Sequence, residues 1–216
     1  MTESSPARAR ALFYAHDRKE VLSGVDIDLP AGRVTAIVGA NGAGKTTLVE
    51  LLAGVRSPQS GEVLLDAPVA LVVQRPDAPA MLPITAREVV ALGAASPVAR
   101  SRTSGRRVRE ALERVGAESL ADAPFARLSG GQRQRVLIAQ GLAVGAGVLI
   151  LDEPAAGLDE RSRARARAIL REEADRGVAV ACVTHDAADI EAADRVVTLR
   201  DGVATLTREA SFPVKP

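Results

Sequence analysis

The sequence predicts an α/β fold in which crossover helices join a parallel β-sheet and a helical segment is inserted into it. Three observations lead to this prediction. A glycine-rich loop separates a strand-like run from a helix-like run within residues 33–53. The apolar pattern is helical from residue 85 to residue 140, and strand-like and helix-like runs alternate from residue 143 onward. Such alternation is typical of a parallel sheet with crossover helices.

The first third of the chain is expected to hold short strands around one helix. Residues from about 9 to 29 alternate in polarity, and Val25–Leu29 is the clearest strand among them. Arg33–Val38 is an apolar run typical of a buried strand. Lys45–Ala53 has a helical pattern and stops at Gly54, a residue type that often follows the last helical turn.

The next segments are expected to form a β-hairpin-like pair and a loop. Glu62–Leu65 and Val69–Val73 are predicted to be a strand pair after the turn at residues 57–61. Residues 75–83 are rich in proline and are predicted to be a loop.

The remaining elements are mostly helical at first and then alternate. Thr85 followed by Glu88 fits a capping box, which predicts a helix start at that point. The other expected elements, in chain order, are helices Thr85–Leu92 and Arg106–Val115, strand Val148–Leu151, helix Glu160–Asp175, strand Val178–Val183, helix Asp186–Ala193 and strand Arg195–Leu199.

Composition limits the class of protein. A chain of 216 residues suffices for one domain with a small insertion, and 2% aromatic content means that Ala, Val, Leu and Ile must pack the core. A formal net charge of +1 gives no general argument for nucleic acid binding. The single cysteine, Cys182, excludes an intramolecular disulfide and is expected in the core. No cluster of metal-ligating residues is visible.

Two arginine-rich stretches, Arg100–Arg109 and Arg161–Arg171, hold five arginines each. Because no aromatic residues alternate with them, we expect solvated and partly ion-paired faces rather than a nucleic acid surface. The first stretch could instead contact anionic lipid or a partner. The N-terminal residues lack the apolar segment of a secretory signal, and no run of 18 apolar residues occurs. We therefore expect a cytosolic chain that does not span a membrane by itself.

The most informative motif is Gly39-Ala40-Asn41-Gly42-Ala43-Gly44-Lys45-Thr46, which fits G-x-x-x-x-G-K-[ST]. Its position between a strand and a helix is the context that a phosphate-binding P-loop requires. Backbone N–H groups of the loop and the helix N-terminus would hold phosphate oxygens. Lys45 would reach the β- and γ-phosphates, and the Thr46 hydroxyl would ligate Mg²⁺.

Four further motifs follow downstream. The apolar strand at residues 148–151 ends in Asp152, which could hold Mg²⁺, and in Glu153, which could polarise an attacking water. Leu128–Gln132 opens a predicted helix, so it offers N–H groups and a hydroxyl to an anion. Gln74 at a strand end could touch metal or water, and His185 after a strand suits a γ-phosphate contact.

Together these motifs resemble those of the ATP-binding cassette (ABC) ATPases. The resemblance extends from Tyr14 to about Asp201, and the Leu-Ser-Gly-Gly-Gln sequence distinguishes this family from other P-loop NTPases. It implies a P-loop NTPase (RecA-like) core, a small antiparallel β-subdomain and an inserted α-helical subdomain. The core with the β-subdomain would comprise residues 1–77 and 141–216, and the helical subdomain about 78–140.

The resemblance also assigns roles to residues. Glu153 would be the catalytic base, His185 the switch histidine and Gln74 the Q-loop glutamine. Mg²⁺ would be held by Thr46, Gln74 and Asp152. ATP would be bound by Tyr14, Gly39, Asn41, Gly42, Ala43, Gly44, Lys45, Thr46, Thr47, Ser129, Gly130, Gly131, Gln132 and Asp159. An aromatic ring would stack on adenine, and Phe13 is the alternative to Tyr14 in that role.

Further implications concern assembly. The family resemblance implies a head-to-tail homodimer with two ATP molecules between the subunits, since Ser129, Gly130 and Gly131 would bind the γ-phosphate held by the partner. Gly157–Asp159 would cross between subunits. Polytopic membrane permease subunits would dock near Gln74 and residues 75–85, and an extracytoplasmic solute-binding protein would act through them. The chain would then lie peripherally on the inner face of the membrane, without a nucleic acid partner.

The sequence departs from the family pattern at two places. Gly61 and Gln74 are close together, so we expect a trimmed β-subdomain. Ala155 stands where a serine is common, which puts a cross-interface hydrogen bond in doubt.

The transported solute is the least constrained expectation. The short segment around residues 72–93 resembles the zinc and manganese importer branch. The alternatives are an importer of another solute such as an iron chelate, or an exporter with the same motor chemistry. A non-transport cassette acting on ribosomes or DNA is a remote alternative, because this chain has one cassette and no coiled-coil heptads.

Overall fold

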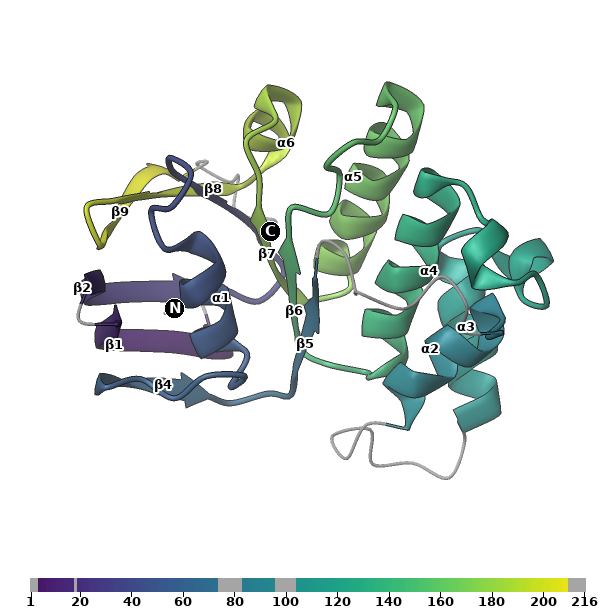
Figure 1. Ribbon diagram of the computed structural model, residues 1–216, viewed down its shortest axis with the longest axis horizontal. Helices are drawn as coiled ribbons and strands as arrows, with labels where there is room; N and C mark the ends of the chain where they lie inside the picture. Colours follow the sequence, from purple (N-terminus) through teal and green to yellow (C-terminus); the bar gives the residue numbers. More distant parts are fainter. Residues whose placement is uncertain (1–3, 18, 74–82, 96–103, 210–216) are drawn as a thin grey trace, which may run out of the picture.

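The computed structural model describes residues 4–17, 19–73, 83–95 and 104–209. A six-stranded sheet occupies the centre (Figure 1). Its strands are parallel except for the last, which runs antiparallel at one edge. In spatial order they are β5 (Val69–Val72), β6 (Val148–Asp152), β7 (Ala179–Val183), β3 (Val34–Val38), β8 (Arg195–Arg200) and β9 (Val203–Glu209). The predicted α/β class and its parallel sheet are confirmed.

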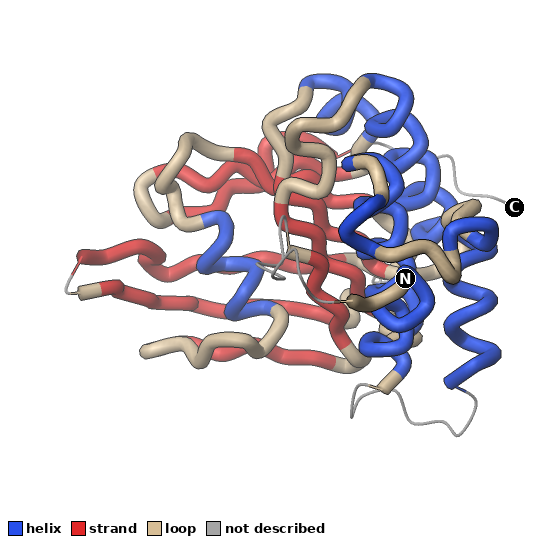
Figure 2. Tube along the Cα trace, turned by 45° about the vertical axis from the view of Figure 1, so that its right-hand side comes forward, coloured by secondary structure: helices blue, strands red, loops and turns tan. Residues whose placement is uncertain are grey.

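A second, antiparallel sheet of three strands lies beside the first (Figures 1 and 2). Its spatial order is β2 (Lys19–Leu29), β1 (Ala7–His16) and β4 (Ser60–Leu65). The expected small antiparallel sheet is therefore present. Its first two strands are longer than the short strands that the polarity pattern indicated.

The predicted pairing of Glu62–Leu65 with Val69–Val73 is wrong. β4 pairs with β1 in the antiparallel sheet, whereas β5 runs parallel to β6 in the central sheet. Backbone hydrogen bonds fix the short connection to both sheets, since Asp66 N–H donates to Pro6 O at 2.8 Å and Gly147 N–H donates to Pro68 O at 3.0 Å. The two apolar runs are neighbours in sequence, but each finds a partner far along the chain.

The helices cover the two faces of the central sheet. α1 (Lys45–Leu52) lies between the two sheets, and the other helices lie beyond the opposite face or above it (Figure 1). Two short 3₁₀ turns, Glu118–Leu120 and Phe125–Arg127, precede the fourth helix. The remaining helices are α2 (Ala86–Ala94), α3 (Ser104–Arg114), α4 (Gly130–Ala143), α5 (Glu160–Asp175) and α6 (Ala187–Ala192).

Alternate side chains of the central strands enter two different apolar clusters. On β6, Val148 and Ile150 pack with α1 and the antiparallel sheet, while Leu149 and Leu151 pack with the helices of the other face. Because both faces are covered, the strand is apolar at every position, as expected for a parallel sheet. Cys182 on β7 lies in the second cluster, and burial raises the pKa of its thiol.

The helical segment packs closely against the core. α4 continues past residue 140, and an added Cβ at Gly141 would lie 2.8 Å from Val72 Cγ2 on β5. The predicted boundary at residue 140 falls within α4, which therefore belongs to both parts. The division into a core and a helical subdomain at residues 78–140 stays a prediction. Glu173 on α5 is fully buried and forms ion pairs with Arg114 on α3 and with Arg176. Among the described residues, no helix has both the length and the apolar character to cross a bilayer.

The crossing of α2 and α4 depends on Gly93. A Cβ at this position would lie 2.0 Å from the backbone oxygen of Gln140. We expect Gly93→Ala to lower the free energy of unfolding by about 1–3 kcal/mol, because backbone atoms would have to move apart. Gly105→Ala on α3 is the matched control. It meets no atom within 4 Å and should be neutral or stabilising in urea unfolding. Equal losses for both variants would contradict close packing at Gly93.

Candidate functional site

The candidate site lies at one edge of the central sheet. β6, β7 and β3 are neighbours and parallel, so their carboxyl ends meet at that edge. The P-loop follows β3, Asp152 ends β6, and Thr184 and His185 follow β7. Crevices outside the carboxyl ends of parallel strands are the usual ligand sites of α/β sheets.

The P-loop conformation requires glycine. Gly42 and Gly44 have φ angles of 80° and 97°, in the left-handed region that other residues rarely adopt. An added Cβ at Gly44 would also lie 2.8 Å from Val21 Cγ1. Gly44 precedes α1, and no side chain caps the N-terminus of this helix. Its first N–H groups can therefore donate to an anion.

Lys45 is buried beneath this loop, with 8% of its surface exposed. Its Nζ donates to the backbone oxygens of Gly39 at 2.9 Å and Ala40 at 3.0 Å. These two bonds compensate for the burial of the ammonium group and tie the beginning of the loop to its end. The positive charge is thus placed directly under the curve of the loop.

Thr46 and Asp152 meet although 106 residues separate them. The Thr46 hydroxyl donates to Asp152 Oδ2 at 2.8 Å. Burial raises the pKa of Asp152 above its ordinary value, and the hydrogen bond from Thr46 opposes that shift. No group of three or more His, Cys, Asp or Glu in the described ranges could hold a metal ion alone. A hydroxyl and a carboxylate instead fit Mg²⁺, which takes few protein oxygens and completes its coordination with phosphate and water.

Glu153 and His185 stand together beside that pair. The backbone of Glu153 has a φ of 47°, and its N–H donates to Val183 O at 3.0 Å. Glu153 Oε1 lies 4.0 Å from His185 Nδ1. Both side chains line a cavity of about 110 Å³, which has room for water. A left-handed backbone at a non-glycine residue is strained, and such residues cluster at functional sites.

An open cavity of about 510 Å³ extends from the P-loop toward β1. Tyr14, Asn41 and Thr47 line it, and Phe13 does not. The Tyr14 hydroxyl accepts from Arg56 Nη1 at 3.2 Å, and the Arg56 guanidinium lies 5.9 Å from the ring centroid. Tyr14 therefore lies beside the P-loop, but Arg56 already engages its ring and hydroxyl.

His16 is a candidate residue that the sequence reasoning missed. It ends β1 and lines the cavity beside Tyr14 as well as a neighbouring cavity of about 670 Å³ along Gly39–Ala43. Its side chain is 68% exposed. The signal that could have found it is its rarity, since it is one of only two histidines in the chain.

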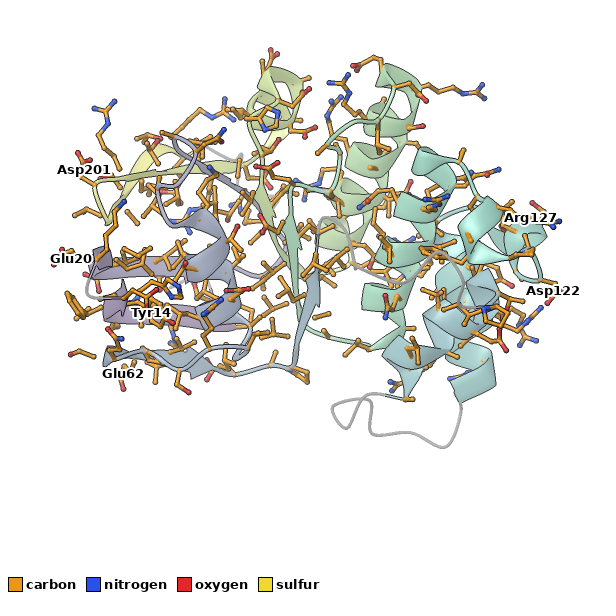
Figure 3. All side chains as sticks on the ribbon, in the orientation of Figure 1. Tyr14, Glu20, Glu62, Asp122, Arg127 and Asp201 are labelled. Carbon is orange, nitrogen blue, oxygen red and sulfur yellow. The ribbon has the colours of Figure 1, made fainter. Side chains whose placement is uncertain are left out.

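The Leu-Ser-Gly-Gly-Gln segment lies away from this site. Ser129 caps α4, because its Oγ accepts from Gln132 N–H at 3.3 Å while Gln132 Oε1 accepts from Ser129 N–H at 2.8 Å. Neither cavity at the P-loop is lined by this segment. Figure 3 places Arg127, two residues before Ser129, at the opposite end of the molecule from Tyr14.

The two glycines of this segment let α4 approach α5. A Cβ on Gly131 would lie 2.2 Å from Ser162 Oγ, and one on Gly130 would lie 3.3 Å from Leu158. Asp159 caps α5, with its Oδ1 accepting from Ser162 N–H at 2.8 Å, and these hydrogen bonds lower the pKa of Asp159. Gln74 lies outside the described residues, so its expected place in the site stays a prediction.

A family model described as ABC transporter matches residues 22–156. The chain belongs to the ABC transporter family. It is 39% identical over 206 residues to the aliphatic sulfonates import ATP-binding protein of Mycobacterium sp. (strain MCS), with 94% of this chain and 83% of that protein covered.

Other relatives of this ABC ATPase carry different names. The zinc import ATP-binding protein of Halorhodospira halophila is 38% identical over 188 residues, covering 85% of this chain and 70% of that protein. The solved structure of cbiO1 from Clostridium perfringens, part of the ABC transporter complex cbiONQ, has a TM-score of 0.81 at 32% identity. The match covers 94% of this chain and 88% of that one. The predicted family and fold are confirmed, and the chain is an ATP-binding, ATP-hydrolysing member of that family.

Asp152→Asn should separate stability from activity in this ABC ATPase. Because burial raises the pKa of Asp152, the fold favours its protonated form, and the carboxylate costs increasing stability as the pH rises from the ordinary pKa of an aspartate to the raised pKa. Asparagine still accepts the Thr46 hydrogen bond without the charge. We expect Tm to rise by about 2 °C at neutral pH and by less near pH 4, while ATP hydrolysis is lost. Calorimetry at both pH values measures this, and a lower Tm at neutral pH would contradict it.

Proposed function

We propose that this chain is the motor subunit of an ABC importer, and that it hydrolyses ATP as a head-to-tail homodimer. The observation that carries the proposal is the separation of two half-sites within one chain. The P-loop cavities are not lined by Ser129–Gln132, and the two ends of the molecule carry Tyr14 and Arg127. A second copy, turned head to tail, would bring its Ser129–Gln132 segment to the P-loop of the first.

ATP binding would exchange the internal contacts of the P-loop for phosphate contacts. The N–H groups at the uncapped start of α1 would donate to phosphate oxygens. The Lys45 ammonium, which now donates to Gly39 and Ala40 oxygens, would donate to the β- and γ-phosphates. Thr46 and Asp152 would hold Mg²⁺, which when bound neutralises phosphate charge.

Hydrolysis would use the pair that flanks the small cavity. Glu153 would accept a proton from the water that attacks the γ-phosphate, and the expelled group is ADP. His185, 4.0 Å from Glu153, would orient that phosphate by a hydrogen bond. Gln74 is proposed to join them from outside the described residues.

The partner subunit's Ser129 would complete the site. In the structure Ser129 Oγ accepts from Gln132 N–H, so the hydroxyl hydrogen remains available to a phosphate oxygen. The N–H groups of Gly130 and Gly131 at the α4 start add further donors. At the other end of the nucleotide, His16 and Tyr14 both line the cavity where the base would lie, and His16 is the more exposed candidate for stacking on it.

The proposed cargo is a metal ion such as zinc or manganese. The zinc import relative supports it, together with the short connection between the antiparallel sheet and β5. The sulfonate import relative, with higher identity and coverage, favours an aliphatic sulfonate as the second candidate. In either case, permease subunits would hold the chain at the inner membrane face near residues 75–85, and a solute-binding protein would deliver the cargo.

Glu153→Gln should bind ATP and fail to hydrolyse it, because the amide accepts no proton. We expect turnover to fall by at least about a hundredfold and an ATP-dependent dimer to accumulate on size exclusion. Glu62→Gln, on the exposed strand β4, is the control and should hydrolyse ATP normally. A variant that stays monomeric with ATP, or that turns over at the original rate, would contradict the role of Glu153.

A deletion strain tests the cargo. Under metal limitation we expect its zinc or manganese content to fall, and the original chain but not Glu153→Gln to restore it. Growth with an aliphatic sulfonate as sole sulfur source is measured in parallel. Normal metal content with failed growth on the sulfonate would transfer the assignment to sulfonates. Normal results in both assays would overturn both cargoes and leave the ATPase intact.

A further inference from the structure

Three arginines of α5 form a ladder along one side of the helix. Arg163, Arg167 and Arg171 recur every four residues, so their side chains lie one above another. Each forms an ion pair with the chain segment that follows β7. The pairs are Arg163 Nη1 with Asp186 Oδ2 at 2.9 Å, Arg167 Nε with Asp189 Oδ1 at 2.9 Å, and Arg171 Nη1 with Asp194 Oδ2 at 2.6 Å.

The first two carboxylates belong to the segment that carries His185. Asp186 follows the histidine directly and caps α6, accepting from Ala188 N–H at 2.9 Å. Asp189 accepts from the Thr184 hydroxyl at 3.0 Å. Residues 184–189 are therefore one hydrogen-bonded unit. A displacement of the Asp186 or Asp189 carboxylate would also displace the backbone at His185.

The apolar contact of α6 is a small one, in which Ile190 packs against Ala36, Ala193 and Val196. α6 has six residues and none of them is buried. A cavity of about 290 Å³ runs along the ladder side of α5 toward β3 and β7, while Ala166 and Ile169 of the same helix pack in the core beside β7. The ladder side chains are between one quarter and one third exposed, so solvent screens their ion pairs less than it screens surface pairs. Figure 1 shows α5 and α6 side by side above the strands.

Arg163, the first arginine of the ladder, lies close to the segment that would face a second subunit. Asp159 caps α5, and Arg163 lies one turn further along the helix. Arg163 also lines the small cavity shared by Glu153 and His185. One side chain thus adjoins the start of α5, the unit that carries His185 and the cavity for the attacking water.

We propose that Arg163 and Arg167 are positioning residues that hold His185 at its working distance from Glu153. This inference rests on the proposed function of that site. A subunit docking against residues 155–159 would move the start of α5, and the ladder would transmit that movement to His185.

The first test uses the monomer and needs no ATPase activity. The chain has only two histidines, so imidazole NMR signals assign directly once His16→Ala has removed one of them. We expect Arg163→Ala to shift and broaden the His185 signals. Arg165→Ala is the matched control, because Arg165 is exposed elsewhere on the same helix. Unchanged His185 signals in folded Arg163→Ala would overturn the proposal.

The second test measures ATP turnover. Arg163→Ala should lower kcat by about tenfold or more with little change in KM, because a misplaced group affects the chemical step. In a His185→Ala background the same change should cause no further loss, whereas a merely structural role would lower activity in both backgrounds. Arg163→Lys keeps the charge and should recover part of kcat.

Asp186→Asn covers the case in which Arg163→Ala fails to fold. Asparagine remains a good cap for α6, yet it removes the charged partner of Arg163. It should displace the His185 signals and lower kcat as Arg163→Ala does. If His185 signals move while His185→Ala retains full turnover, the positioning stands and the proposed role of His185 fails. If they do not move, the ladder does not position His185.

Discussion

The parallel pairing of β3, β6 and β7 is the constraint on which the rest of the site depends. Parallel strands place their carboxyl ends at one edge, so the residues that leave each strand become neighbours without being close in sequence. Asp152 leaves β6 beside Val183 of β7, and the P-loop leaves β3 on the other side of β7. The hydrogen bond between Thr46 and Asp152 exists because this register holds.

Several polar groups that would bind ATP already have partners in the single chain. Lys45 donates to two loop oxygens, Ser129 and Gln132 cap α4, and Asp159 caps α5. An exchange of one hydrogen-bond partner for another costs little net free energy, whereas a buried group without any partner is expensive. ATP would therefore replace existing contacts, such as those of Lys45 with the oxygens of Gly39 and Ala40, at little net cost.

The motifs could be located from the sequence because their chemistry depends on local spacing. The P-loop, Asp152, Glu153 and His185 meet at one sheet edge in the structure. Long-range features could not be found in this way. β5 pairs with β6, and the paired residues Val69 and Val148 are 79 positions apart in the sequence. β9 is almost wholly exposed, so no apolar pattern marks it. The left-handed backbone of Glu153 arises where β6 ends beside β7, which a local pattern does not contain.

The ion-pair partners of the α5 arginines are another long-range feature that the sequence did not contain. Their sequence indicated a solvated, partly ion-paired face, and only the fold shows that three of them meet carboxylates around α6. Coupling between sites requires an element with two arrangements. Arg167 lies 2.9 Å from Asp189 and 3.7 Å from Asp186, so it already stands between two carboxylates. A small shift of α5 would move Arg167 from one carboxylate to the other without leaving its guanidinium unpaired, and an ion-pair ladder can therefore move where a packed apolar interface would resist.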